Sequence, residues 1–251
     1  KESGLEFDHV TFVYPDGEEA VLKDVSFQVR PGETIAFIGS TGSGKSTLIN
    51  LIPRFYDVTS GEIRLNGKNL EDYTLEELRD RIGFIPQKAN LFSGTIRKNL
   101  SYGKQEASDE ELYEALRTAQ GYDFVVNQKD GLDTVITEGG SNFSGGQKQR
   151  LSIARALVRK PDIYVFDDSF SALDFATDAK LRKALKPVTR KAMTMIVAQR
   201  VSTIMDADKI VVLDSGKVVG YGTHRQLLKS CSVYYEIAAS QLSEEELLYE
   251  A

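Results

Sequence analysis

Two adjacent carboxylates, Asp167 and Asp168, stand where the apolar run "IYVF" stops, and such a pair suits metal-assisted chemistry on a water molecule. One acid of the pair can hold a metal ion while its neighbour orients the attacking water. An apolar run that ends in one Asp is, by itself, more often an ordinary strand end. A role for the two acids therefore depends on a second group of residues elsewhere in the chain.

The stretch "GSTGSGKST" at 39–47 supplies that second group, because it matches the phosphate-binding pattern G-x-x-x-x-G-K-[ST]. Its glycines let the backbone wrap a phosphate with N–H groups. Lys45 offers a positive charge to the phosphate oxygens, and Ser46 can ligate Mg²⁺. The predicted phosphate-binding residues are Gly39, Ser40, Thr41, Gly42, Ser43, Gly44, Lys45, Ser46 and Thr47.

The surroundings of this loop agree with a phosphate site. "ETIAFIG" is a compact apolar strand that stops at glycine, and "KSTLINLIPRFY" has a helix pattern that ends near Pro53. Strand, loop and helix follow without a gap, and the helix adds the positive end of its dipole. A loop of this type needs an acid at the end of a neighbouring strand to hold the magnesium shell, and Asp167 meets that requirement.

The elements that must position these residues differ along the chain. Residues 5–30 indicate short β-segments around a "PDG" turn, "GEIRLNGKNL" adds a strand with a turn at "NG", and residues 82–87 add another. From about 92 to 159 the pattern is mainly helical. It includes a predicted capping box of Ser108 and Glu111 and an amphipathic helix in "SGGQKQRLSIARALVRK".

After Pro161 the chain returns to a sheet pattern. "DIYVFD", "AMTMIVA" and "KIVVLD" are short apolar runs that alternate with helical segments, which is typical of strands buried on both faces of a parallel sheet. "YYEIAASQLSEEELLYE" predicts a C-terminal helix that frays into an acidic end. We expect one α/β domain over 1–251, with a core over about 1–91 and 160–251 and an inserted helical subdomain over about 92–159.

Composition excludes several classes of protein. The net charge is -6 and the sequence pI is about 5.2, without a basic stripe, which argues against nucleic acid as a partner. The one cysteine, Cys231, excludes an intramolecular disulfide and a cysteine-rich metal site. No apolar run approaches the roughly 20 residues that span a bilayer. The start "KESGLEFDHV" has no initiator Met or signal-like core, so we interpret the chain as a soluble fragment of a longer protein.

One further stretch points to a family. "FSGGQKQR" at 143–150 resembles the signature sequence of ATP-binding-cassette (ABC) ATPases, and it precedes Asp167 at the spacing which that family shows. The resemblance covers nearly the whole chain. It implies a P-loop NTPase (RecA-like) fold with a mostly parallel core sheet, an N-terminal antiparallel β-subdomain and the inserted helical subdomain. It also implies an ATPase that binds ATP and Mg²⁺.

Other residues match the family pattern position by position. Tyr14 in "TFVYP" resembles the aromatic residue that stacks on adenine, and Gln87 in "IPQ" resembles the glutamine that joins the magnesium shell and faces the membrane partner. "TEGG", Thr137 to Gly140, is similar to an exporter segment that contacts coupling helices, and "SALD" at 171–174 resembles the loop that crosses to the opposing subunit, with Asp174 as its acid. Read singly, each has an ordinary structural explanation; their order and spacing favour the family.

The resemblance also implies a head-to-tail dimer, in which each ATP lies between one subunit's phosphate loop and the other's signature. N–H groups at the start of the signature helix can meet the γ-phosphate. Exporter members carry this domain after their transmembrane helices, at the cytoplasmic face of a membrane, and "YDVTSGEIRLNG" and "LFSGTIRKNL" resemble exporters more than importers. The implied signature residues are Ser144, Gly145, Gly146 and Gln147.

Two positions depart from the pattern of competent members. Those members have Glu after the magnesium acid, where it polarises water, and His on a switch loop at the γ-phosphate; this chain has Asp168 and Gln199. Asp withdraws the carboxylate by one methylene, and a displacement on the order of 1 Å can cost about 10²-fold in rate, roughly 2.7 kcal/mol. Gln199 can donate a hydrogen bond but cannot be protonated. The chain's histidines, His9 and His224, both read as structural.

These departures lead to a hypothesis of an asymmetric heterodimer. The chain's own phosphate loop would build a degenerate, slowly hydrolysing site, while its signature completes a competent site on a partner that supplies Glu and His. The implied catalytic residues are Lys45, Asp168, Asp174 and Gln199, and the implied metal ligands are Ser46, Gln87 and Asp167.

Three alternatives stay open. Asp168 could be an adequate base in a symmetric homodimer, or the chain could act as an ATP-dependent clamp. A cassette ATPase of DNA repair or chromosome structure would need a long coiled-coil insertion and a basic surface. Only about a hundred residues separate Lys45 from Ser144, without sustained heptads, so that class fits least well.

Overall fold

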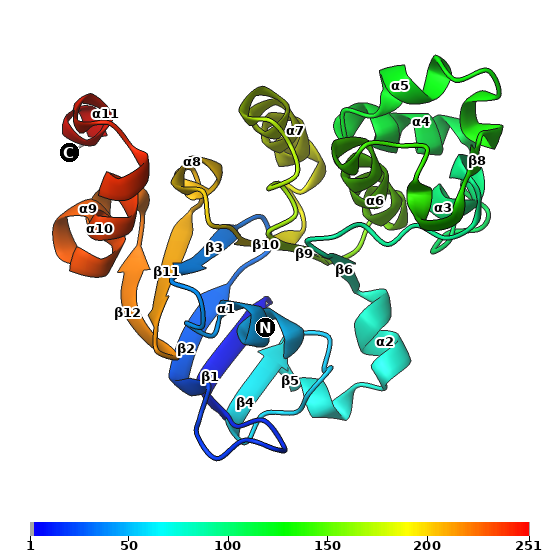
Figure 1. The fold of residues 1–251 in the computed structure, drawn as a ribbon. Coiled ribbons are helices and arrows are strands. Elements are labelled where there is room, and N and C mark those ends of the chain that lie inside the picture. The colour runs from blue at the N-terminus through cyan, green and yellow to red at the C-terminus, as the bar shows by residue number, and fades with distance from the viewer. Residues whose placement is uncertain (1–2, 251) are drawn as a thin grey trace.

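Two β-sheets form the centre of the computed structural model, which describes residues 3–250, with side chains described through Leu247. The six-stranded sheet has the order β12-β11-β3-β10-β9-β6, and the four-stranded sheet has the order β2-β1-β4-β5 (Figure 1). The strands are β1 (Leu5–Phe12), β2 (Leu22–Val29), β3 (Thr34–Gly39), β4 (Ser60–Leu65), β5 (Lys68–Asn69), β6 (Ile82–Ile85), β7 (Gly94–Thr95), β8 (Val135–Ile136), β9 (Ile163–Asp167), β10 (Met193–Val197), β11 (Lys209–Asp214) and β12 (Lys217–Gly222).

Helices cover the six-stranded sheet and form a separate group beside it (Figure 1). The helices are α1 (Lys45–Asn50), α2 (Leu75–Asp80), α3 (Ile96–Leu100), α4 (Asp109–Thr118), α5 (Tyr122–Val126), α6 (Gly145–Arg159), α7 (Phe175–Val188), α8 (Val201–Ile204), α9 (His224–Ser230), α10 (Ser232–Gln241) and α11 (Glu244–Glu250), with short 3-10 turns η1 (Leu70–Asp72), η2 (Gly131–Asp133) and η3 (Glu138–Gly140). The group beside the sheet is α3 to α6, with the small β7-β8 pair.

The six-stranded sheet confirms the predicted parallel core. Strands β11, β3, β10, β9 and β6 pair in parallel, and only β12 runs antiparallel, at the edge. Along β3, Ala36 and Ile38 belong to the apolar cluster shared with the helices, whereas Ile35 and Phe37 belong to the cluster shared with the four-stranded sheet. This burial on both faces is the reason that the core strands are continuous apolar runs rather than alternating ones.

The four-stranded antiparallel sheet confirms the predicted β-rich N-terminal part. Phe7 of β1 stacks on Phe27 of β2 with ring centroids 4.4 Å apart. Asn66 and Gly67, between β4 and β5, both have positive φ, 53° and 79°, which an Asn-Gly hairpin turn requires. The sheet therefore packs as a second layer on the core that carries the phosphate loop.

Two helices in the group beside the sheet begin at serine caps. Ser108 Oγ accepts the Glu111 N–H at 3.2 Å, but the Glu111 carboxylate pairs with Lys104 at 2.6 Å, so only half of the predicted capping box forms. Ser144 starts α6 with a complete box: its Oγ accepts the Gln147 N–H at 3.1 Å, and Gln147 Oε1 accepts the Ser144 N–H at 2.9 Å. The amphipathic helix expected after the signature serine is confirmed.

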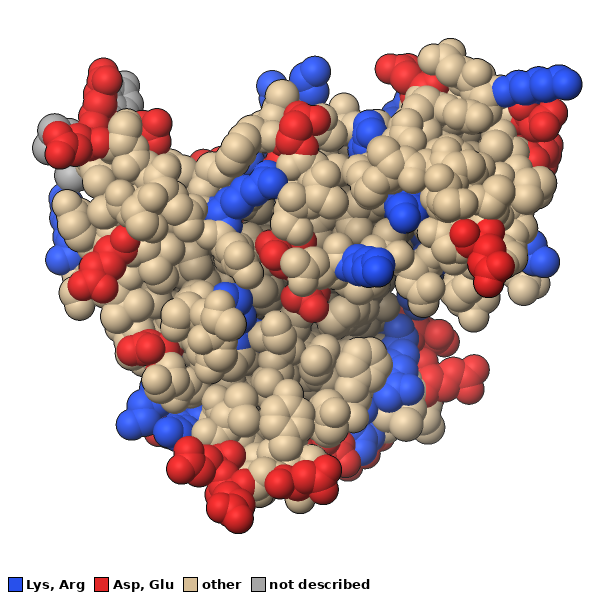
Figure 2. Space-filling view, in the orientation of Figure 1, with Lys and Arg blue, Asp and Glu red and all other residues tan. Residues whose placement is uncertain are grey.

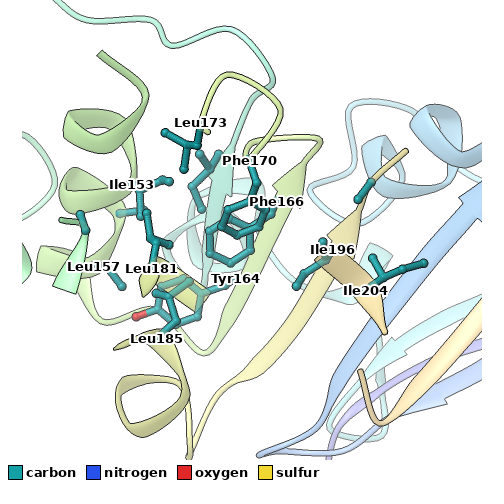
Figure 3. Packing of buried hydrophobic residues seen from close by; sticks show 14 of the residues in the cluster. Ile153, Leu157, Tyr164, Phe166, Phe170, Leu173, Leu181, Leu185, Ile196 and Ile204 are labelled. Carbon is teal, nitrogen blue, oxygen red and sulfur yellow. The ribbon is translucent and has the colours of Figure 1, made fainter. Parts of the chain in front are cut away.

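Apolar packing anchors the loop between β9 and α7. Phe166 at the end of β9 stacks on Phe170 of this loop, with ring centroids 5.0 Å apart. Phe170 and Leu173 are buried in one cluster with Ile153 of α6 and Leu181 of α7 (Figure 3). The segment that follows the two adjacent acids is therefore held against both helices.

The C-terminal segment forms two helices, so the expectation of a single helix was wrong. Leu242 after α10 is extended, with φ -99° and ψ 150°. Ser243 Oγ then accepts the Glu246 N–H at 3.1 Å and caps α11. Serine followed three residues later by glutamate is a start signal for a helix, and here it outweighs the continuous helical pattern.

The face of the molecule seen in Figure 2 carries both acidic and basic side chains, interspersed with uncharged surface. Among residues 3–250, no helix combines the length and the apolar character that crossing a bilayer requires.

Candidate nucleotide-binding site

The glycine-rich loop joins β3 to α1, and two of its glycines adopt backbone conformations that favour glycine. Gly42 has φ +79° and Gly44, the N-cap of α1, has φ +104°. A Cβ atom on Gly44 would also lie 2.8 Å from the Leu22 Cδ2 atom. Side chains are strained in this region of φ, so the turn into α1 depends on glycine.

The base of the loop is fixed from both sides. A Cβ atom on Gly39 would lie 2.3 Å from the Leu213 carbonyl oxygen of β11 and 2.5 Å from Ser43 Oγ. The Ser43 N–H donates to the Ser40 carbonyl at 3.0 Å, and the Gly216 N–H donates to the Ser43 carbonyl at 2.9 Å. The loop therefore leaves the sheet in one defined direction.

The loop residues fit a nucleotide phosphate with Mg²⁺. A surface depression of about 220 Å³ is lined by the loop together with Val21 and Gln199. The buried Ser43 Oγ has no hydrogen-bond partner among the described residues, and Ser46 is exposed. Mg²⁺ bound with a nucleotide takes hydroxyl or carboxylate ligands together with phosphate oxygens, and Ser46 and Asp167 offer such oxygens. No group of three or more His, Cys, Asp or Glu suited to a metal occurs in the described part.

The charges beside the loop are one lysine and two acids. Lys45 Nζ donates to the Gly39 carbonyl at 2.6 Å. Burial lowers the pKa of Lys45, and the charges of Asp168 and Asp167 oppose that shift. Burial raises the pKa of Asp167, the neighbouring Asp168 raises it further, and Lys45 opposes both effects. A bound cation at these acids would relieve their repulsion and favour their ionised forms.

Asp168 lies between residues of two neighbouring segments. Gln87 Nε2, after β6, donates to Asp168 Oδ2 at 3.2 Å, and the Gln199 backbone N–H, after β10, lies close enough to influence the Asp168 carboxylate. Burial raises the pKa of Asp168, and the Gln199 N–H, Lys45 and Arg200 oppose that rise. The family pattern places Gln87 in a magnesium shell; in this structure its amide contacts the second acid.

The segment around Gln199 joins three parts of the site. Gln199 lines the depression at the phosphate loop, and its backbone N–H lies beside the Asp168 carboxylate. The next residue, Arg200, donates from Nη2 to the Ser171 carbonyl at 2.9 Å and from Nη1 to the Leu173 carbonyl at 3.0 Å. The switch position and the "SALD" loop are therefore tied together within one chain.

Sequence reasoning missed Arg200 and Gln241. Arg200 directly follows Gln199 in "IVAQRV", and its place next to the switch position could have identified it. The side chain of Gln241 contacts the backbone on both sides of Arg200 from the end of α10. Nothing in the sequence marks that glutamine.

Tyr14 lies next to the end of the phosphate loop. Its hydroxyl is 2.7 Å from Thr47 Oγ1, and its ring packs edge-on against Phe12 and Tyr56, with centroids 4.8 and 5.2 Å apart. Stacking of this ring on adenine stays a prediction.

The signature residues lie on a different part of the molecule from the phosphate loop. Ser144 caps α6, in the helical group, and no hydrogen bond between described residues joins residues 144–147 to residues 39–47. A Cβ atom on Gly146 would lie 3.4 Å from the Ala172 carbonyl oxygen, whereas one on Gly145 would meet nothing within 4 Å. The signature thus adjoins the "SALD" loop and has open space at its first glycine.

Asp174 uses both carboxylate oxygens within its own helix. Oδ1 accepts the Thr177 N–H at 2.8 Å and Oδ2 accepts the Thr177 hydroxyl at 2.8 Å. These bonds lower the pKa of Asp174. Asp174 is therefore the N-cap of α7 in this structure.

The "TEGG" segment is a short surface turn. Thr137, Glu138 and Gly139 are exposed, and the Gly140 N–H donates to the Thr137 carbonyl at 2.7 Å. Thr137 Oγ1 lies 2.9 Å from the Ser141 hydroxyl. The segment forms part of the surface of the helical group.

Comparison with known proteins agrees with this geometry. A family model described as ABC transporter matches residues 22–171. An uncharacterized ABC transporter ATP-binding protein of Mycobacterium tuberculosis is 52% identical over 234 residues, which are 92% of this chain and 40% of that protein. A Staphylococcus aureus protein, whose name proposes that it is a multidrug export ATP-binding/permease protein, is 46% identical over 241 residues, 96% of this chain and 42% of that protein.

A solved structure gives the same result. The chain resembles the structure of a bacterial Atm1-family ABC exporter with ATP bound, with a TM-score of 0.92 and 38% sequence identity. The match covers 97% of this chain and 42% of the other. The chain therefore spans about two fifths of the proteins it matches.

The fold, the phosphate loop and the family match lead to one conclusion. The predicted P-loop NTPase fold is confirmed, and ATP-binding domains of this kind are ATPases that bind ATP with Mg²⁺. The chain belongs to the ABC transporter family and is an ATP-binding domain of it.

Proposed function

We propose that this chain is the nucleotide-binding domain of an ABC exporter and that its own ATP site is degenerate. It dimerises around ATP with a second, non-identical nucleotide-binding domain. Its phosphate loop builds a slowly hydrolysing site, and its signature completes a competent site on the partner. The exporter neighbour and the name of the Staphylococcus aureus relative support the transport role.

One observation carries the degenerate site: the two departing residues lie together at the phosphate loop. The Gln199 backbone N–H lies beside the Asp168 carboxylate, and Gln199 lines the depression beside Lys45. Both departures therefore act on one bound γ-phosphate. Asp168 is also tethered by Gln87, which favours a carboxylate held back from the attacking water.

The separation of signature and phosphate loop supports a head-to-tail arrangement. Residues 144–147 begin α6 with Gly145 open to an incoming group, so a phosphate from another subunit can approach these N–H groups. The proposed partner contacts of the signature are Ser144, Gly145, Gly146 and Gln147, and Asp174 with the "SALD" loop lies beside them.

The remaining assignments follow if the chain is the nucleotide-binding domain of an exporter. Residues 92–159 serve as the helical subdomain, and transmembrane domains dock near Gln87 and the surface turn Thr137–Gly140. The domain then lies at the cytoplasmic face of a membrane. Tyr14 stacks on adenine, Lys45 contacts the phosphates, and Ser46, Gln87 and Asp167 belong to the magnesium shell.

The test compares Mg-ATP turnover and ATP binding of the unmodified chain with those of the double variant Asp168→Glu, Gln199→His. We expect both proteins to bind ATP. The double variant should turn over about 100-fold faster than the unmodified chain, because a displacement on the order of 1 Å at the base costs that much. The matched control makes the same chemical changes at exposed positions, Asp130→Glu with Gln128→His, and leaves turnover unchanged.

The outcomes separate the alternatives. Equal and rapid turnover by the unmodified chain and the double variant would mean that Asp168 is a working base in a symmetric homodimer. Tight binding without turnover in either protein would favour an ATP-dependent clamp. If the unmodified chain does not bind ATP, the proposed nucleotide site is wrong.

A further inference from the structure

The side-chain amide of Gln241, the last residue of α10, spans the backbone around Arg200. Gln241 Nε2 donates to the Gln199 carbonyl at 2.7 Å, and Gln241 Oε1 accepts the Val201 N–H at 2.7 Å. Both ends of one amide are thus used by one short segment. Exchanging the amide oxygen and nitrogen would set donor against donor and acceptor against acceptor, so the hydrogen-bond pattern fixes the orientation of the amide.

Gln241 supplies an acceptor that the short helix α8 lacks. α8 begins at Val201, and its N-cap Arg200 makes no side-chain capping bond. The first N–H groups of a helix need acceptors from outside the helix. Gln241 provides one for Val201, which is fully buried.

The segment 199–201 is where several contacts of the ATP site meet. Gln199 lines the depression at the phosphate loop, and its N–H lies beside the Asp168 carboxylate. The Arg200 guanidinium donates to the Ser171 and Leu173 carbonyls. Because Gln241 fixes the Gln199 carbonyl and the Val201 N–H, it sets the planes of the two peptides on either side of Arg200, and with them the direction in which the Arg200 side chain leaves the backbone.

α10 is anchored well enough to hold such a contact. Its Tyr234 and Ala238 are fully buried in the core cluster shared with β11 and α8. The Leu242 N–H closes the helix on the Ala238 carbonyl at 2.8 Å. The position of Gln241 is therefore set by core packing and not only by its own hydrogen bonds.

We propose that Gln241 is a positioning residue of the ATP site, which holds residues 199–201 so that Gln199 stays at the phosphate-loop depression and the Arg200 guanidinium faces the "SALD" carbonyls. The proposal rests on the ATP site of the proposed function, but it does not depend on the asymmetric pairing. The contacts of Gln241 are to backbone atoms, so they are independent of which side chain stands at position 199.

The decisive variant is Gln241→Glu, which keeps the shape and the acceptor but loses the donor. An ionised carboxylate would repel the Gln199 carbonyl, whereas a protonated carboxyl group can donate to it and still accept from Val201. Gln241→Met keeps the length of the side chain and loses both bonds at every pH. Gln128→Glu adds the same charge at an exposed position that the mechanism does not use.

Turnover is measured in the Asp168→Glu, Gln199→His background, where hydrolysis is expected to be fast. We expect Gln241→Glu and Gln241→Met to lower kcat by about 10-fold near neutral pH, with the KM for Mg-ATP within about twofold, because positioning rather than binding is lost. An ordinary Glu pKa is about 4.3, and here the Gln199 carbonyl oxygen raises it while the Val201 N–H lowers it, so the ratio of Glu-variant to parent turnover rises as pH falls from about 8 to about 5. The ratio for Gln241→Met stays constant.

A second measurement needs no turnover. Hydrogen exchange of the peptide covering 198–204 is followed in the chain without nucleotide, and we expect Gln241→Met to speed it by about 10-fold because the Val201 N–H loses its acceptor. Unchanged exchange in that variant, or pH-independent ratios for both variants, would overturn the proposal. If the parent does not bind ATP, the proposed function is wrong. The hydrogen-exchange result still decides whether Gln241 holds residues 199–201.

Discussion

Gln87 Nε2 donates a hydrogen bond to Asp168 Oδ2 at 3.2 Å. The second acid of the pair, which follows β9, is thus bonded to a residue that follows the neighbouring strand β6. The two residues are 81 positions apart, and strands β6 and β9 bring them together by pairing in parallel. The position of the carboxylate therefore depends on the pairing of these two strands.

The first prediction concerns this bond. Gln87→Ala removes a donor to a carboxylate and should lower the free energy of unfolding by about 1 kcal/mol. Urea denaturation measures the change. Asn90→Ala, at an exposed position on the same loop, is the control and should have no effect. A Gln87 variant as stable as the parent would show that the contact contributes nothing.

The second prediction is a pH dependence of stability at Asp168. Burial raises the pKa of this acid in the folded chain, so its ionised form opposes folding at high pH, and the chain regains that stability as pH falls through the raised pKa. Asp168→Asn should therefore melt at a higher temperature than the parent at pH above the raised pKa, by about 2–4 °C for each kcal/mol gained. The gain should shrink toward acidic pH. A difference in Tm that stays the same over the whole pH range would contradict the assigned cause.

The third prediction tests Asp174 as a helix cap. Asp174→Ala removes the acceptor of the Thr177 N–H and should lower the Tm by a few degrees, whereas Asp174→Asn, which still caps, should change it little. The bonds from Thr177 lower the pKa of Asp174, so its contribution is present at neutral pH and is lost as pH falls through that lowered pKa. Equal Tm values for the Ala and Asn variants would argue that the cap has no effect on stability.

The fourth prediction concerns the buried acid Asp178 of α7. Asp178 is 1% exposed, pairs with Arg182 Nε at 2.7 Å and accepts the Thr203 hydroxyl at 2.9 Å. Asp178→Ala leaves a partly buried cation without its partner and should lower the free energy of unfolding by about 3–5 kcal/mol. Asp162→Ala removes an exposed pair with Arg81 and should cost less than about 1 kcal/mol. Similar losses for the two variants in urea denaturation would rule out this difference.

The fifth prediction separates the ring of Tyr14 from its hydroxyl. Tyr14→Phe keeps the ring and loses the bond to Thr47, so ATP affinity should stay within about threefold of the parent. Tyr14→Leu removes the stacking surface and should weaken ATP binding by roughly 10-fold or more. Equilibrium titration with ATP measures both. If the Leu variant binds ATP as tightly as the Phe variant, the ring does not contact the base.

Much of the fold was readable from local pattern. The strand, glycine loop and helix of the phosphate site follow one another directly in the sequence, so Gly39 to Thr47 could be assigned without knowledge of the rest. The parallel strands were readable because burial on both faces removes the polar alternation. The C-terminal helix break was missed, because the continuous helical pattern masks the start signal at Ser243 in the sequence.

The sequence by itself determined the phosphate loop, the two acids, the parallel core and the family, since each depends on short-range spacing or on burial that leaves a trace in residue type. Only the tertiary structure decided that Gln87 reaches Asp168, that Arg200 holds the "SALD" carbonyls and that Gln241 holds the backbone beside Gln199. These contacts join segments far apart in the chain. Their geometry depends on strand order and helix packing, and a single polar residue such as Gln241 reads the same in the sequence whether it contacts water or a neighbouring backbone.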